Sequence, residues 1–317
     1  MWGEPSGAYT DAPPRPEHLP LILFSHGNGG KPATSDTPLG GVFLRIAVNL
    51  PMCELRSGLR EQSTFLMVHL ASLGFLAAAP DHVGNTVEDI PPVEDVERRK
   101  QAHRKARARR PHDLVAVYRY LTAPDAPSQR PHARSGGIGV AGHSFGGWTA
   151  LKLAVLRLLP VAAVLALAPA SEPFVGRGAF QPGELPPPAD VPVVVVASDR
   201  DVMVDYETSV RPLCARLGGS HRLLLMVNTD HYHYCDAAET IHDSRGREAA
   251  LASSKPFVPF AEMVSEQRAH TVLRTTAATL FRGALLERQP VAELLAAPWA
   301  AVDPCVQLVN VPPTARL

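Results

Sequence analysis

Short, unbroken apolar runs recur along the first three quarters of the chain. Six of them stand out, at residues 19–25 (LPLILFS), 74–80 (GFLAAAP), 137–141 (GIGVA), 161–169 (VAAVLALAP), 191–197 (VPVVVVA) and 222–228 (RLLLMVN). Within each run, apolar residues follow one another instead of alternating with polar ones, which is typical of strands buried on both faces. We therefore predict six buried β-strands.

Apolar residues at helical spacing fill the intervals between these runs. Such stretches lie at residues 61–72, 96–121, 144–158 and 206–217, and a longer one covers 258–287. Strands that alternate with helices predict an α/β protein whose mostly parallel sheet is covered by helices on both faces and binds ligands beyond the carboxyl ends of its strands. No repeat or linker separates two cores, so we predict a single domain over residues 1–317, with a cap-like insertion at 31–60.

Composition and charge exclude several classes of protein. The chain has 317 residues, 45% of them hydrophobic, which is enough for a sizeable core. Lys plus Arg and Asp plus Glu both number 31, so the formal net charge is zero and nucleic acid is not an expected partner. We expect the basic run at 98–110 to be a solvated helix face. The longest apolar stretch, at 158–170, is shorter than the ~20 residues that a membrane-spanning helix needs.

The first residues contain no apolar core of the kind found in signal peptides. The default expectation is a cytoplasmic protein, or an exported one if an upstream signal is missing. The four cysteines lie far apart without a CxxC spacing, at Cys53, Cys214, Cys235 and Cys305. The sequence therefore predicts neither a disulfide framework nor a zinc ribbon, and it leaves their pairing and the oligomeric state open.

The strongest chemical signal is a G-x-S-x-G pattern at residues 142–146, between an apolar strand and a helical stretch. This pattern is typical of a tight strand-to-helix turn that presents the serine hydroxyl above the sheet, because the glycines leave room for the turn. The start of the helix behind the serine favours developing negative charge. We therefore predict that Ser144 is a catalytic nucleophile; an ordinary Gly-rich turn is the alternative.

A serine nucleophile needs a base and a group that orients the base, and on this scaffold the chain order is Ser, acid, His. The stretch SDRDVMV follows the fifth predicted strand, and TDHYHYCD follows the sixth. For the acid we favour Asp201, which lies further into its loop, over Asp199, which could pair with Arg200. For the base we favour His231 over His233.

A metal site is an alternative interpretation of the last cluster, since the alternating residues His231, His233 and Cys235 could face one way. His221 or His242 could complete a set of ligands, but no known zinc-binding spacing emerges. We therefore expect neither a metal ion nor a cofactor.

Ester chemistry on such a scaffold also needs two backbone N–H groups for the oxygen that becomes negative. The residue after the nucleophile, Phe145, would supply one of them. The glycine-rich loop HGNGG after the first strand would supply the other, with Asn28 as the predicted donor. A phosphate-binding loop is the alternative, but neither G-K-[ST] nor G-x-G-x-x-G is present.

These stretches together resemble the α/β-hydrolase superfamily. The resemblance is carried, over about residues 19–236, by LPLILFSHGNGG, HLASLGFLAAAPDHVGNT, RPHDLVAVYRYL, IGVAGHSFGGWTA, VPVVVVASDRDVMV and VNTDHYHYCD. Within the superfamily the chain is similar to predicted dienelactone hydrolases and platelet-activating-factor acetylhydrolase-like serine esterases, with bacterial polyester hydrolases as relatives. The resemblance implies an eight-stranded, mostly parallel sheet. It also implies a catalytic triad of Ser144, Asp201 and His231, and an oxyanion hole formed by the backbone N–H groups of Asn28 and Phe145.

The chain departs from these families in three places. Dienelactone hydrolases carry cysteine where this chain has Ser144, family members usually begin with two further strands, and their counterpart of the 31–60 segment is shorter. Because of the second departure, we expect a chain that lacks its first strands. From the predicted triad, we expect hydrolysis of carboxylic esters with short- to medium-chain acyl groups. Polyester or acetyl-phospholipid hydrolysis by the same mechanism, and a catalytically silent binding protein, are the alternatives.

Overall fold

The computed structural model describes residues 18–28, 44–46, 60–86, 89, 95–123, 133–176 and 178–312. Within these ranges, eight strands form one sheet in the order β2-β3-β1-β4-β5-β6-β7-β8. The strands are β1 (Leu21–Ser25), β2 (Leu44–Ile46), β3 (Leu76–Pro80), β4 (Ile138–His143), β5 (Val161–Leu167), β6 (Val193–Ser198), β7 (His221–Met226) and β8 (Val306–Val309).

The six predicted strands are all present, as β1 and β3 to β7, and they run parallel to one another. The other two strands are antiparallel and form the edges of the sheet, β2 beside β3 and β8 beside β7. Patterning did not reveal them because they are only three and four residues long. The eight-stranded, mostly parallel sheet that the family resemblance implies is confirmed.

Helices connect the strands. In the described part of the chain they are α1 (Thr64–Ser72), α2 (Val96–Thr122), α3 (Phe145–Leu156), α4 (Glu172–Val175), α5 (Arg211–Cys214), α6 (Ala238–Ala252), α7 (Glu266–Phe281) and α8 (Val291–Leu295). Short 3₁₀ and π-helical segments add η1 (Tyr206–Val210), η2 (Gly218–Ser220), η3 (His231–Tyr234), η4 (Phe260–Glu262), η5 (Arg282–Leu286) and η6 (Trp299–Val302).

Three predicted helices match α1, α2 and α3, and the others differ from prediction. The long helix expected from residue 258 begins only at Glu266, because Ser265 caps it and accepts a hydrogen bond from the Arg268 amide. The stretch expected as one helix at 206–217 divides into the π-helical turn η1 and the single turn α5. Helix α6 was not predicted, because its sequence AETIHDSRGREAALA is largely polar.

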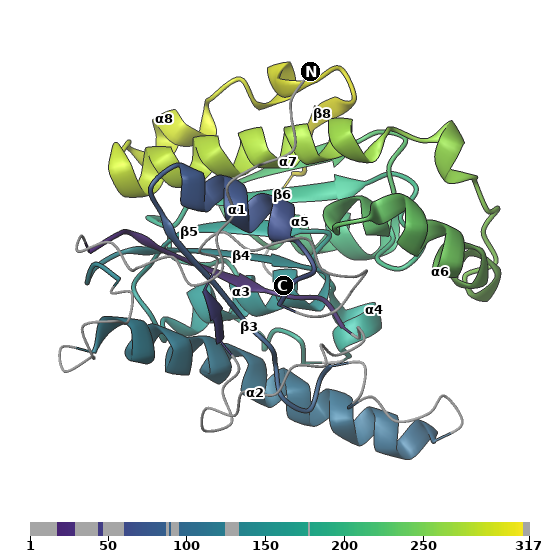
Figure 1. Cartoon of the computed structure of the whole chain (residues 1–317), viewed down its shortest axis with the longest axis horizontal. Coiled ribbons are helices and arrows are strands. Elements are labelled where there is room, and N and C mark those ends of the chain that lie inside the picture. The colour runs from purple at the N-terminus through teal and green to yellow at the C-terminus, as the bar shows by residue number, and fades with distance from the viewer. Residues whose placement is uncertain are drawn as a thin grey trace.

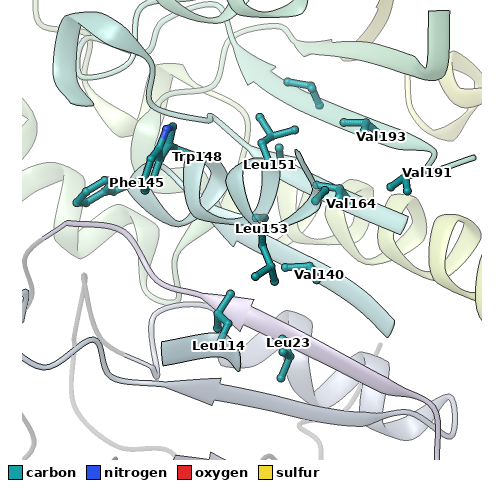
Figure 2. Close-up of a cluster of buried hydrophobic side chains, with 14 of the residues drawn as sticks. Leu23, Leu114, Val140, Phe145, Trp148, Leu151, Leu153, Val164, Val191 and Val193 are labelled. Atoms are coloured by element: carbon teal, nitrogen blue, oxygen red, sulfur yellow. The ribbon is translucent and has the colours of Figure 1, made fainter. Parts of the chain in front are cut away.

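The sheet lies between two layers of helices (Figure 1), which explains why its strands are apolar without alternation. Helices α1 and α7 contribute to the core on one face, and α2 and α3 to the core on the other. Figure 2 shows part of the second core, where Leu151 and Leu153 of α3 lie with Val140 of β4 and Val164 of β5. This second core therefore fixes α3 against the strands that precede and follow it, β4 and β5.

Two expectations fall on parts of the chain outside the described ranges. Residues 1–17 precede β1, and most of the 31–60 insertion is likewise not described. Missing first strands, a cap-like insertion and a single domain over the whole chain therefore stay predictions. None of the helices that the structure describes is long and apolar enough to cross a bilayer.

Candidate active site

Ser144 lies in a strained turn between β4 and α3. Its backbone has φ 57° and ψ −118°, in the region that residues with a side chain rarely adopt. Two hydrogen bonds fix the turn to the segment of β5 and its following loop: the Ser144 amide donates to Leu167 O at 2.8 Å, and the Ala170 amide donates to Ser144 O at 2.9 Å. The hydroxyl is thus presented at the N-terminal end of α3, where the helix dipole favours negative charge.

The two glycines of the G-x-S-x-G pattern are required by close backbone contacts. A Cβ atom on Gly146 would lie 1.8 Å from the carbonyl oxygen of Ser25 in β1, and a Cβ on Gly142 would lie 2.2 Å from Gly146 O. Any side chain at either position would displace backbone. The pattern therefore reflects how tightly the turn packs against β1.

The two predicted partners of the serine, Asp201 and His231, contact each other. Asp201 Oδ2 accepts from His231 Nδ1 at 2.7 Å, and both residues are buried. The other carboxylate oxygen accepts the amides of Met203 and Val204 at 2.8 and 2.7 Å, which fixes its orientation. A carboxylate held in this way favours the His231 tautomer that has its proton on Nδ1, leaving Nε2 as the acceptor.

Hydrogen bonds join the loops that carry Asp201 and His231. The hydroxyl of Ser198, at the end of β6, bonds with the hydroxyls of Thr229 and Tyr234, each at 2.8 Å. Asp199, the rejected alternative for the acid, accepts the amides of Asn228 and Thr229 at the turn after β7. Its role is to fix this turn, and not the salt bridge with Arg200 that we expected.

His231 lies on the same end of the sheet as the serine. The imidazole of His143, the residue before Ser144, has its ring centroid 4.4 Å from that of His231. A Cβ placed on Gly27 would be 3.5 Å from both Ser144 Cβ and His143 Nδ1, so the loop after β1 also borders this point. Within the described ranges, no hydrogen bond joins the Ser144 hydroxyl to His231.

The second histidine of the cluster, His233, belongs to a different network. Its Nδ1 lies 2.7 Å from Asp230 Oδ1, and its Nε2 donates to Val264 O at 2.8 Å. The other oxygen of Asp230 accepts from His242 Nδ1 at 2.5 Å, and His242 Nε2 donates to Val258 O at 2.9 Å. All four ring nitrogens are therefore engaged within the protein.

The charges in this second network stabilise one another. Burial acts to raise the pKa of Asp230, but the hydrogen bonds and charges of His233 and His242 hold it well below its usual range. Burial likewise disfavours the charged form of His242, yet the hydrogen bond and charge of Asp230 outweigh it and raise the pKa of that imidazole. The network is a buried structural ion pair beside the candidate site.

The loop after β1 carries Asn28, one of the two predicted oxyanion donors. The neighbouring Gly27 amide is already engaged, since it donates to Gln62 Oε1 at 2.8 Å. The Asn28 side chain is also engaged, because its Oδ1 accepts from Asn85 Nδ2 at 2.6 Å. The second predicted donor, Phe145, is fully buried at the first position of α3.

Residues that the sequence did not assign complete the site. Gln62 contacts Gly27, His143 and Cys235 together, which links the loop after β1 to both histidine-bearing segments. Arg110 and Asn85 also contact this loop, Arg110 at the carbonyl of His26 and Asn85 at the side chain of Asn28. Both residues belong to stretches that carry the family resemblance. The sequence could have indicated them as polar residues at positions that the neighbouring apolar pattern predicts to be buried.

The metal alternative finds no support in the described ranges. His231 and His233 bond to different aspartates, and no three His, Cys, Asp or Glu side chains described by the structure are arranged to bind an ion. The three cysteines in these ranges, Cys214, Cys235 and Cys305, are free and buried. Burial raises the pKa of Cys214 to about 12, so this thiol stays protonated at neutral pH.

The strand order, the parallel pairing and the tight turn at Ser144 between a central strand and a helix are those of the α/β-hydrolase fold, and this chain has that fold. A solved structure that it resembles is the ferulic acid esterase from Streptomyces cinnamoneus, with a TM-score of 0.59 and 22% sequence identity; the match covers 94% of this chain and 75% of that one. No protein-family model and no curated protein matches the chain. The narrower resemblance to dienelactone hydrolases and acetylhydrolases stays a prediction.

Proposed function

We propose that the protein is a serine hydrolase that cleaves carboxylic esters through an acyl-enzyme. One observation carries the proposal: a serine in a strained turn at a helix N-terminus lies at the same sheet edge as an aspartate–histidine pair formed by two other loops. Such a combination is what nucleophilic catalysis by serine requires. The missing hydrogen bond between Ser144 and His231 fits the same mechanism, because catalytic contacts commonly tighten only around bound substrate.

In this mechanism Ser144 Oγ attacks the ester carbonyl carbon while His231 Nε2 takes the hydroxyl proton. Asp201 stabilises the resulting imidazolium through Nδ1. The carbonyl oxygen becomes negative and accepts hydrogen bonds from the amides of Asn28 and Phe145. When the tetrahedral intermediate collapses, the alcohol leaves with the proton from His231. Water then attacks the acyl-enzyme by the same route and releases the carboxylic acid.

The substrate is proposed only as a class of esters. We propose esters with short- to medium-chain acyl groups, with polyesters and acetyl-phospholipids as alternatives. The structural relative is named for ferulic acid esters, so an aromatic acyl ester belongs among the compounds to test. A panel of p-nitrophenyl esters from acetate to decanoate, together with methyl ferulate, would rank these classes by kcat/KM.

Replacing the nucleophile tests the mechanism directly. Ser144→Ala should lower kcat for the best ester by at least about 10⁴-fold and abolish labelling by a fluorophosphonate probe. Ser209 offers a matched control, because it is an equally buried serine, located in η1. Ser209→Ala should retain labelling and turnover. Undiminished hydrolysis by Ser144→Ala would refute the proposal, and absence of any labelling in the wild type would favour a catalytically silent protein.

A further inference from the structure

Arg110, in helix α2, is a fully buried cation that the proposed mechanism does not use. Its guanidinium donates hydrogen bonds to four neutral acceptors: His26 O, Ser25 Oγ at 3.2 Å, Thr149 Oγ1 at 3.1 Å and Asn85 Oδ1. In the described ranges no carboxylate forms an ion pair with it. Asp113, three residues further along α2, is bonded to His82 Nδ1 at 2.7 Å instead.

A buried charge with no hydrogen-bonded counter-charge is costly, and the nearby charge of Asp113 offsets that cost only in part. Burial lowers the pKa of Arg110 to about 9, which leaves the group protonated at neutral pH. A hydrophobic residue of similar volume would avoid the desolvation cost of the charge, but it would leave the surrounding acceptors without this donor. Arg110 is therefore a buried charge whose main contacts are the hydrogen bonds that it donates to neighbouring segments.

One side of the guanidinium contacts the loop that carries Asn28. Arg110 Nη2 donates to the carbonyl of His26, two residues before Asn28. Arg110 Nη1 donates to Asn85 Oδ1, and Asn85 Nδ2 in turn donates to Asn28 Oδ1 at 2.6 Å. Asn85 is buried, so the bond between Arg110 and Asn85 is shielded from water. Through these contacts, Arg110 helps to fix the backbone conformation of the loop at Asn28.

The other side of the guanidinium contacts the start of α3, which carries Phe145. The Arg110 Cζ atom lies 4.6 Å from the centre of the Phe145 ring. Arg110 Nε donates to Thr149 Oγ1, whose hydroxyl donates to Phe145 O at 2.9 Å. Figure 2 shows Phe145 beside Trp148 at this end of the helix. A single side chain thus bridges the two segments that carry the proposed oxyanion donors.

We propose that Arg110, acting through Asn85, is a positioning residue that fixes the amides of Asn28 and Phe145 toward one point, and that its positive charge favours the oxyanion formed there. This inference rests on the proposed serine hydrolase function. Its physical basis is that pre-oriented donors and fixed charges stabilise a transition state because they need no reorganisation during the reaction. Arg110 itself does not touch the substrate.

The variant Asn85→Asp separates this role from a purely structural one. The new carboxylate can still accept from Arg110, and it gives the buried cation a counter-charge. It cannot donate to Asn28 Oδ1, and it neutralises the positive charge near the oxyanion. If Arg110 matters only for stability, the variant should be as stable as the wild type or more so, with unchanged turnover. If our inference is right, kcat should fall on the order of 100-fold, with KM changed less than about threefold.

Arg110→Lys provides a second variant, because it keeps the charge but loses the planar fork that reaches both segments. We expect an intermediate loss of kcat. Arg109→Met, an exposed change on the same helix, is the control and should behave as wild type. Turnover should be expressed per active site titrated with a fluorophosphonate, alongside the melting temperature, so that unfolded protein does not count as lost catalysis.

A transition-state analogue gives the second readout. Inhibition by a trifluoromethyl ketone, which forms an oxyanion on addition of Ser144, should weaken in Asn85→Asp by about the same factor as kcat. Wild-type kcat per titrated site and unchanged ketone inhibition in both variants would overturn this inference alone. A wild-type protein that is neither labelled nor active on esters would overturn the proposed function and this inference with it.

Discussion

Two of the aspartate–histidine contacts at this end of the sheet, Asp201–His231 and Asp230–His242, differ in what the second ring nitrogen of the histidine does. In the Asp201–His231 contact, the nitrogen opposite the aspartate has no hydrogen-bond partner within the described ranges. In the Asp230–His242 contact, the corresponding nitrogen donates to a backbone carbonyl, that of Val258. Both aspartates are almost completely buried, and the aspartate–histidine distances are 2.7 and 2.5 Å.

The comparison shows that an aspartate–histidine contact does not by itself mark a proton relay. A histidine enclosed by acceptors on both nitrogens is stabilised as a cation, because each nitrogen must carry a proton to bond. A histidine with one unengaged nitrogen can instead accept a proton from a neighbouring hydroxyl. His242 fits the first description and His231 the second, although the two belong to adjoining segments.

Breaking the first contact should have the largest effect. Asp201→Asn should lower kcat by about 10⁴-fold, because the amide favours the wrong imidazole tautomer. The fold should survive, since the asparagine oxygen can still accept the amides of Met203 and Val204. Steady-state kinetics with active-site titration would measure the loss, and thermal unfolding would serve as the control. Turnover within tenfold of wild type would mean that Asp201 does not orient the base.

Breaking the second contact should affect stability and leave the chemistry largely intact. Asp230→Asn removes the counter-charge of the buried His242 imidazole, which should lower the free energy of unfolding by about 3 kcal/mol. Turnover per titrated site should stay within tenfold of wild type. Urea unfolding followed by tryptophan fluorescence would measure the loss. A variant as stable as wild type with lost turnover would reverse the roles that we assign to the two aspartates.

The smallest expected effect concerns pH. Because the pKa of His242 is raised in the folded state, its contribution to stability is fully present below the unfolded pKa of about 6.5 and is lost as pH rises through the folded value. His242→Leu should remove this part of the pH dependence, so that urea midpoints at pH 6 and pH 8.5 lie closer together than in wild type. An unchanged difference between the two midpoints would assign the dependence to another group.

Much of this arrangement was predictable from local sequence. The six buried strands and the tight turn at Ser144 depend on short patterns whose physical cause is local, and the structure confirms both. The glycines around Ser144 are one example, because the backbone contacts that exclude a side chain are set by the turn itself. The choice of Asp201 over Asp199 as the catalytic acid stays a prediction; the structure shows that Asp201 contacts His231. The preference for His231 over His233 is consistent with their separate contacts in the structure.

The remaining part depended on contacts between segments distant in the chain. Arg110 lies in α2 on the same face as Ala106 and Leu114, at positions four residues apart, which indicates a buried site. We predicted a solvated helix face for the whole basic run at 98–110, and for its last residue, Arg110, this prediction was wrong. Patterning alone did not separate Arg110 from the exposed arginines before it. Gln62 bonds to residues 35, 81 and 173 positions away, so no local pattern could have indicated its partners.

The hydroxyl of Ser198, at the end of β6, bonds to Thr229 and Tyr234 in the segment after β7 and so joins the two segments close to the sheet. A length change in either segment would therefore disturb its neighbour, and with it the aspartate and histidine that they carry. Insertions and deletions should consequently be tolerated poorly in both segments. Libraries built to alter the preferred ester would do best to keep the two joined loops at constant length.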